Sequence, residues 1–140
     1  TYSGHPLACA SAAASIAIFE EEGLVERAKA VGEGVLGPAL AALADSHPSI
    51  GEVRGLGMFW AIELVKDRST REPLVPFNGS GAAAAPVAQV VAELKRNGVL
   101  VFSHFNRIHV TPPLVTSEAD LLHGVAALDP ALALADAHVA

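Results

Sequence analysis

The spacing of hydrophobic residues predicts that the chain begins with a long helix. Residues 6–22 are rich in alanine, and Ile16 and Phe19 recur at helical spacing. Pro6 suits the first helical turn and Gly23 suits the helix end. Because this helix is apolar nearly all round, we expect it to pack against protein on more than one side.

A second stripe of apolar residues predicts another helix, which glycines and a proline interrupt. The stripe consists of Leu24, Ala28, Val31 and Val35. In a helix interior a glycine costs about 1 kcal/mol and a proline about 3 kcal/mol. We therefore expect a kink or break near Pro38, after which the helix resumes to Ala44.

The same glycines match the spacing of a dinucleotide-binding loop. The segment is Gly32-Glu33-Gly34-Val35-Leu36-Gly37, and Glu52 follows at about the distance of the acidic residue that binds a ribose. A dinucleotide-binding loop follows an apolar strand, however, whereas residues 27–31 are charged and have a helical pattern. We therefore interpret the glycines as an interruption of a helix.

Alternating residues after Pro48 predict short strands. Residues 50–54 and 58–65 form two extended segments around a glycine-rich bend, and residues 66–81 have the prolines, glycines and charges of a loop. The remaining predicted elements are a helix at 82–97, strands at 99–103 and 107–111, a helix from a cap at Thr116 or Ser117 to near Leu128, and a helical end at 131–139 after a kink at Asp129-Pro130. This order predicts an α+β fold in which helices cover a short sheet.

Composition indicates a packed globular piece. A chain of 140 residues has room for one domain with a real core, and 51% hydrophobic against 17% charged residues argues against disorder. The net charge of -6 and the scarcity of aromatic residues argue against a nucleic-acid partner. No apolar run approaches the roughly 20 residues that span a bilayer, so we expect no membrane partner. The single Cys9 excludes an intramolecular disulfide and favours a cytoplasmic location.

Candidate catalytic groups are few. His104 and His109 lie close together but lack the spacing of a metal site, and no serine lies in a nucleophile elbow. Lys29, Lys66 and Lys95 each lie near another charged residue, which indicates a solvated amine, whereas a Schiff-base lysine is desolvated. We therefore predict no metal site and no catalytic residue in this chain. Because it opens without a methionine, we also expect it to be a piece of a longer protein.

Four segments resemble class III pyridoxal-phosphate-dependent aminotransferases, the ω-transaminase type especially. They are TYSGHPLA at 1–8, VRGLGMFWAIEL at 53–64, NGVLV at 97–101 and NRIHVTPPL at 106–114. They follow one another in the family's order and with compatible spacing, and the resemblance covers essentially all 140 residues. It is closest to the carboxy-terminal part of such an enzyme, the part that follows the cofactor lysine.

The resemblance implies a fold, a reaction and an assembly. The fold is type I, with residues 1–23 as the end of the large domain and a linking helix, and residues 24–140 as the small carboxy-terminal domain. The intact protein is expected to move an amino group from an amine or ω-amino acid to a 2-keto acid with pyridoxal 5'-phosphate. It is expected to be a homodimer with a shared active site, and the piece alone is expected to be inactive without the Schiff-base lysine.

The resemblance also implies three site residues. Thr1 matches a threonine that contributes to the cofactor phosphate of the neighbouring subunit. Many relatives place an arginine three residues before the Pro-Pro pair, where it can meet a substrate carboxylate. This sequence has His109 at that position and Arg107 two residues earlier. On a strand their side chains share a face, so either residue is a candidate for substrate binding.

Two other functions remain open from the sequence. An aminomutase or racemase uses the same fold, because the choice of reaction depends on pocket residues elsewhere in the protein. A stand-alone small domain for self-association or binding is the non-enzymatic alternative. In that case the apolar first helix is the surface that would be exposed.

Overall fold

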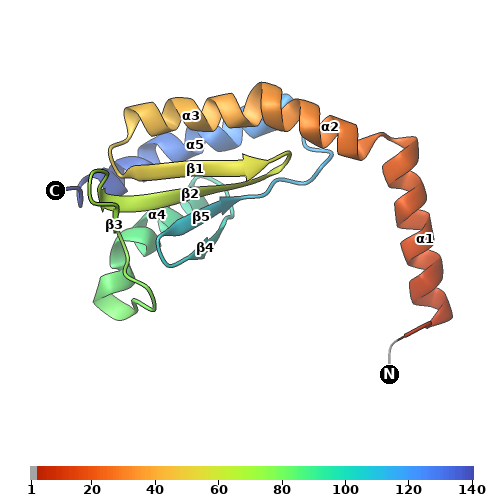
Figure 1. The fold of residues 1–140 in the computed structure, drawn as a ribbon, viewed down its shortest axis with the longest axis horizontal. Coiled ribbons are helices and arrows are strands. Elements are labelled where there is room, and N and C mark those ends of the chain that lie inside the picture. Colours follow the sequence, from red (N-terminus) through yellow and green to blue (C-terminus); the bar gives the residue numbers. More distant parts are fainter. Residues whose placement is uncertain (1–2) are drawn as a thin grey trace.

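The computed structural model describes residues 3–140, which form an antiparallel sheet with helices on one face (Figure 1). Its helices are α1 (Pro6–Glu21), α2 (Leu24–Val31), a π-helical segment η1 (Gly32–Leu36), α3 (Gly37–Ser46), a 3-10 turn η2 (Gly81–Ala84), α4 (Ala85–Arg96) and α5 (Glu118–Asp136). Its strands are β1 (Ile50–Leu56), β2 (Phe59–Asp67), β3 (Glu72–Pro73), β4 (Phe102–His104) and β5 (Arg107–Val110). The predicted α+β fold, a short antiparallel sheet covered by helices and preceded in the chain by a long helix, is confirmed.

The main sheet has the strand order β1-β2-β5-β4, and the short β3 pairs with the other end of β2. Its covered face packs against α3, α4 and α5. The core between these layers includes the fully buried side chains of Leu40, Ile62, Val90, Ile108 and Leu132. Burial of each such side chain stabilises the fold by about 1.5–3 kcal/mol relative to its exposed state.

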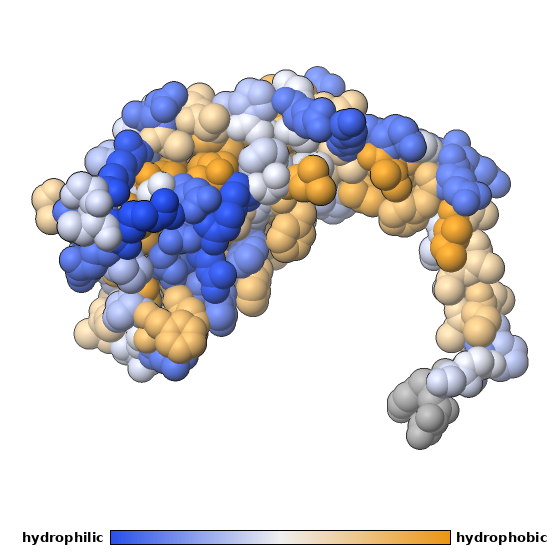
Figure 2. All heavy atoms as spheres, in the orientation of Figure 1, coloured by the Kyte–Doolittle hydropathy of each residue, from blue (hydrophilic) through white to orange (hydrophobic). Residues whose placement is uncertain are grey.

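The first helix extends away from this body and buries none of its residues (Figure 1). It ends one residue before the predicted boundary. Leu7 is 74% exposed, and Ile16 and Phe19 are also exposed, so α1 shows a largely apolar surface (Figure 2). The expected packing of this helix on more than one side is therefore not provided by residues 3–140.

The interruption of the second helix, predicted near Pro38, is a π-helical segment that ends two residues before this proline. Pro38 occupies the first turn of α3, where its missing N–H is harmless. The π-helical segment η1 begins at Gly32, and a Cβ there would lie 2.1 Å from the carbonyl oxygen of Gly57. A Cβ on Gly37 would lie 2.8 Å from the Trp60 ring. The glycines therefore let the helix approach the β1–β2 turn, which agrees with a helix interruption and excludes a phosphate loop here.

Two boundaries near the other end also differ from prediction. The predicted strand at 99–103 is shorter, because β5 pairs with β4 only over residues 102–104. The helical end predicted beyond Pro130 belongs to the same helix, α5, which stops at Asp136, three residues before the predicted Val139. Its amino terminus is capped as predicted, because the Ser117 hydroxyl accepts a hydrogen bond from the backbone N–H of Asp120 at 3.1 Å.

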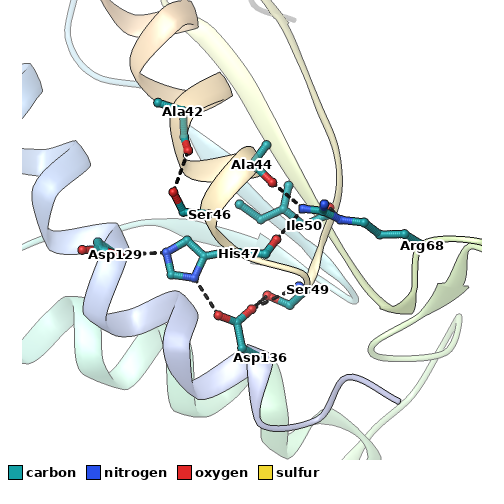
Figure 3. A network of polar contacts seen from close by, with 9 residues as sticks. All are labelled: Ala42, Ala44, Ser46, His47, Ser49, Ile50, Arg68, Asp129 and Asp136. Carbon is teal, nitrogen blue, oxygen red and sulfur yellow. Dashed lines mark hydrogen bonds and ion pairs between the residues drawn. The ribbon is translucent and has the colours of Figure 1, made fainter.

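A buried histidine joins α5 to the turn after α3 (Figure 3). His47 is 5% exposed, with Nδ1 2.7 Å from an Asp136 oxygen and Nε2 2.9 Å from an Asp129 oxygen. The second oxygen of Asp136 accepts hydrogen bonds from the backbone N–H and the hydroxyl of Ser49. Burial opposes ionisation of Asp136, but the hydrogen bonds from Ser49 and His47 outweigh it and lower the pKa of this carboxyl.

Candidate functional site

The open face of the sheet carries a group of hydrophilic side chains (Figure 2), and the strand register places them in rows that cross the strands. The alternation of side chains brings every second residue of a strand to this face. One row runs across β1, β2, β5 and β4 as Glu52, Glu63, Arg107 and His104. The next row runs in the same strand order as Arg54, Ala61, His109 and Phe102.

The charge of Arg54 is neutralised within the sheet. Its Nη1 lies 2.8 Å from Glu63 Oε2 and 3.0 Å from Glu52 Oε2. The hydrogen bond that Arg54 donates to Glu63 is the largest influence that raises the pKa of Arg54. Arg71 also donates to Glu52 at 2.8 Å, and this bond is the main reason that the pKa of Glu52 is lowered. The two carboxylates therefore neutralise the two guanidinium groups. This cluster stabilises the sheet and offers no free charge to a ligand.

Arg107 differs because, among residues 3–140, it takes part in no ion pair. Its Nη2 lies 3.0 Å from His104 Nδ1. A guanidinium has donors only, so the Nδ1 of His104 accepts this hydrogen bond and carries no proton. Arg107 is half-buried and keeps an uncompensated positive charge on the open face.

His109 lies beside Arg107 on the same face of β5 and is neutral at pH 7. Burial lowers its pKa, and the nearby positive charges of Arg107 and Arg54 lower it further. The imidazole contacts the edges of apolar rings, with centroid distances of 6.0 Å to Phe59 and 5.3 Å to Phe102. It therefore offers one hydrogen-bond donor and one acceptor without a charge.

These groups line one open pocket. Its lining residues are Arg54, Gly55, Leu56, Phe59, Ala61, Arg107 and His109. The pocket combines one free cation, a neutral imidazole and an apolar wall. Such a surface can hold a small anion with a short apolar body, because a guanidinium donates two parallel hydrogen bonds to a carboxylate.

The predicted substrate-binding residues, Arg107 and His109, thus meet in one pocket, and their role in binding stays a prediction. Thr1 lies outside the described residues. Sequence analysis missed Arg54 as a wall of this pocket, although its position on an alternating strand opposite Ala61 was a usable signal. In the part of the chain that the structure describes, no group of three His, Cys, Asp or Glu side chains is arranged to hold a metal ion.

None of the three lysines fits the covalent attachment of pyridoxal phosphate. Lys29 and Lys95 are exposed on α2 and α4. Lys66 lies on β2 with its Nζ 2.8 Å from Glu72 Oε1, in an exposed ion pair. A Schiff-base lysine needs a desolvated amine, so this chain supplies no covalent centre. Within residues 3–140, no helix has the length and apolar character needed to cross a membrane.

Comparison with known proteins gives a consistent result for the whole chain. Residues 1–132 match the family described as aminotransferase class-III. The ethanolamine-phosphate phospho-lyase homolog 1 of Caenorhabditis elegans is 38% identical over 137 residues, which cover 96% of this chain and 27% of that protein. The 5-aminovalerate aminotransferase of Pseudomonas putida is 39% identical over 132 residues, which cover 92% of this chain and 28% of that protein.

A solved structure with a similar fold is that of taurine:2-oxoglutarate aminotransferase from Bifidobacterium kashiwanohense, in complex with pyridoxal phosphate and glutamate. It superposes with a TM-score of 0.89 at 32% identity, covering 100% of this chain and 30% of that one. The chain therefore spans less than a third of the length of these relatives. Its sequence and its fold place it in one family: the chain belongs to the class III aminotransferases.

Proposed function

We propose that the intact protein is a transaminase that moves an amino group from an amine or ω-amino acid to a 2-keto acid. Family membership supports this, as does the likeness to an aminotransferase solved with pyridoxal phosphate and glutamate. Pyridoxal 5'-phosphate is the cofactor of the intact protein, and when bound it supplies an electron sink for the substrate carbon that loses a proton. The covalent lysine belongs to a part of the protein outside this chain.

The observation that carries the proposal is the free charge of Arg107 in the pocket with His109. Arg54 is balanced by two glutamates, so the pocket has one uncompensated positive charge. A single guanidinium matches a carboxylate monoanion better than a phosphate dianion. In this proposal Arg107 binds the acid group of the keto acid, and His109 orients it by one hydrogen bond.

The domain division supports a shared site between subunits. Residues 1–23 are the end of the large domain and a linking helix, and residues 24–140 are the small carboxy-terminal domain. The apolar, unburied surface of α1 supports this division, because an isolated helix of this kind needs a protein partner. The intact protein is a cytoplasmic homodimer in which Thr1 contributes to the cofactor phosphate of the neighbouring subunit; for Thr1 the support is its place in the family motif.

The test of this function is the dependence of the reaction on a keto acid. The intact protein, supplied with pyridoxal phosphate and an ω-amino acid or monoamine, should consume the amine only when a 2-keto acid is present. One molecule of amino acid should appear for each amine lost. An aminomutase or racemase would convert its substrate without the keto acid, and that result would overturn the proposal. A stand-alone binding domain would give no conversion under either condition.

A further inference from the structure

We infer that His104 is a positioning residue that aims the guanidinium of Arg107 at the acid group of the substrate. The inference rests on the proposed function, in which Arg107 binds that group, and adds the residue that controls its orientation. His104 lies directly opposite Arg107 in the β4–β5 pair. Its Nδ1 accepts a hydrogen bond from Arg107 Nη2 at 3.0 Å. One of the five N–H donors of the guanidinium is thereby fixed, and the others remain for a ligand.

The neutral imidazole holds Arg107 without cancelling its charge. Glu63 lies opposite Arg107 on the other side, in β2, but Arg54 already occupies this carboxylate at 2.8 Å. A direct pair between Arg107 and Glu63 would neutralise the only free cation of the pocket. The hydrogen bond to His104 instead fixes one nitrogen of the guanidinium, and its charge remains available to an anion in the pocket.

The ring of His104 is itself fixed by aromatic neighbours. Its centroid lies 4.1 Å from that of Phe105, and it is stacked nearly parallel to Phe102 at 6.5 Å with an angle of 11° between the planes. Phe105 in turn contacts Phe77 at 5.0 Å. Aromatic rings at these separations attract one another, so rotation of the imidazole away from Arg107 loses ring contacts.

The hairpin turn that carries His104 is attached firmly to the sheet. Phe105 has a φ of 53°, a left-handed conformation that is rare for a bulky residue and persists only where the surroundings enforce it. Asn106 supplies that enforcement. Its side-chain amide donates to the Leu64 carbonyl at 3.1 Å, and its own carbonyl accepts from the Leu64 N–H at 2.7 Å. A rigid turn is what a positioning residue requires, because a mobile one would not define the direction of Arg107.

The experiment uses the intact protein with pyridoxal phosphate and measures KM and kcat for the keto acid and for a monoamine that has no acid group. His104→Leu removes the acceptor and should raise the keto-acid KM about three- to tenfold, the effect of one lost hydrogen bond. The monoamine KM and the kcat should stay within about twofold of the wild type. His104→Asn offers an oxygen near the place of Nδ1 and should recover most of the keto-acid KM.

The outcomes separate this inference from the proposed function. Arg107→Gln should raise the keto-acid KM more than His104→Leu does. If Arg107→Gln raises this KM and His104→Leu leaves it unchanged, the positioning role is wrong and the proposed function stands. If Arg107→Gln leaves the keto-acid KM unchanged, the proposed role of Arg107 in substrate binding is wrong, and the inference about His104 is overturned with it. If His104→Leu changes both KM values and kcat together, the residue is structural and the inference is overturned.

If His104→Leu folds poorly, two polar variants still test the positioning role of His104. His104→Gln places its amide oxygen one bond farther from the backbone than His104→Asn does. With both side chains polar, the keto-acid KM should be raised in His104→Gln and near wild type in His104→Asn. Equal values in the two variants would contradict a role for the Nδ1 hydrogen bond.

Discussion

Two regions of the molecule place histidines in opposite electrostatic surroundings: the His47 group with its two carboxylates, and the group of His104 and His109 with Arg107. His47 is buried under α5, and each of its ring nitrogens faces a carboxylate. His104 and His109 lie on the open face beside Arg107, and within residues 3–140 neither ring pairs with an acid. Both ring nitrogens of His47 have a partner within the chain, so this histidine serves the fold. The second group keeps a free cation and unused hydrogen-bonding atoms, which is what the recognition of a ligand requires.

Removal of His47 should have the largest effect on stability. His47→Leu removes a hydrogen-bond partner from both Asp129 and Asp136, and a buried polar group that loses its partner costs about 1–3 kcal/mol. In the intact protein, amide hydrogen exchange in α5 and in the turn after α3 should become faster. His104→Leu is the matched control and should leave exchange in α5 unchanged. Equal effects of the two variants on α5 would remove the distinction between the groups.

The pH dependence of stability should follow from Asp136. Its pKa is lowered in the folded state, so its contribution is fully present above the unfolded pKa of 3.8 and is lost as the pH falls through the lower folded value. Urea unfolding of the intact protein between pH 5 and pH 3 should therefore show a falling midpoint. In Asp136→Asn the midpoint should be lower at pH 5, and its decrease toward pH 3 should be smaller.

The exposed partner of His47 should matter less than the buried one. The side chain of Asp129 is 67% exposed, against 22% for Asp136. Exposed ion pairs contribute about 0–1 kcal/mol because solvent and salt screen them. Asp129→Asn should thus lower the urea midpoint by a small fraction of the change that Asp136→Asn produces. A larger loss in Asp129→Asn would show that the network depends on the outer carboxylate.

His109 should give the smallest effect and a different pH range. Its pKa is lowered in the folded state, so the unfolded chain takes up a proton first as the pH falls below 6.5. The stability that the neutral ring contributes is therefore present above pH 6.5 and declines below it. The thermal midpoint of the intact protein should fall more between pH 7.5 and pH 5.5 than that of His109→Phe. Identical slopes would exclude this titration.

The sequence predicts one of these groups better than the other. Arg107 and His109 are two residues apart on a predicted strand, so local alternation is enough to bring them to one face. The His47 group depends on Asp129 and Asp136, which lie 82 and 89 residues away in the chain. No local pattern encodes such a contact. The helices and strands of the fold are largely predictable for the same reason, because their periodicity is local.

The wrong predictions concern features that tertiary contacts decide. The π-helical segment lies at Gly32 because the Gly57 carbonyl approaches it across the fold. Residues 99–101 are apolar but have no strand partner, since β5 pairs only with residues 102–104. Intrinsic preference was overridden at each of these places.

The measurement that tests the account most directly is the keto-acid KM of Arg107→Gln in the intact protein. Loss of a charge-assisted hydrogen bond of about 1.5–3 kcal/mol should raise this KM roughly 10- to 100-fold, with the KM of an acid-free amine unchanged. Arg71→Gln is the matched control, because Arg71 is exposed, pairs with Glu52 and lies outside the pocket. An unchanged keto-acid KM in Arg107→Gln would contradict the claim that the open face of this sheet binds the substrate acid group.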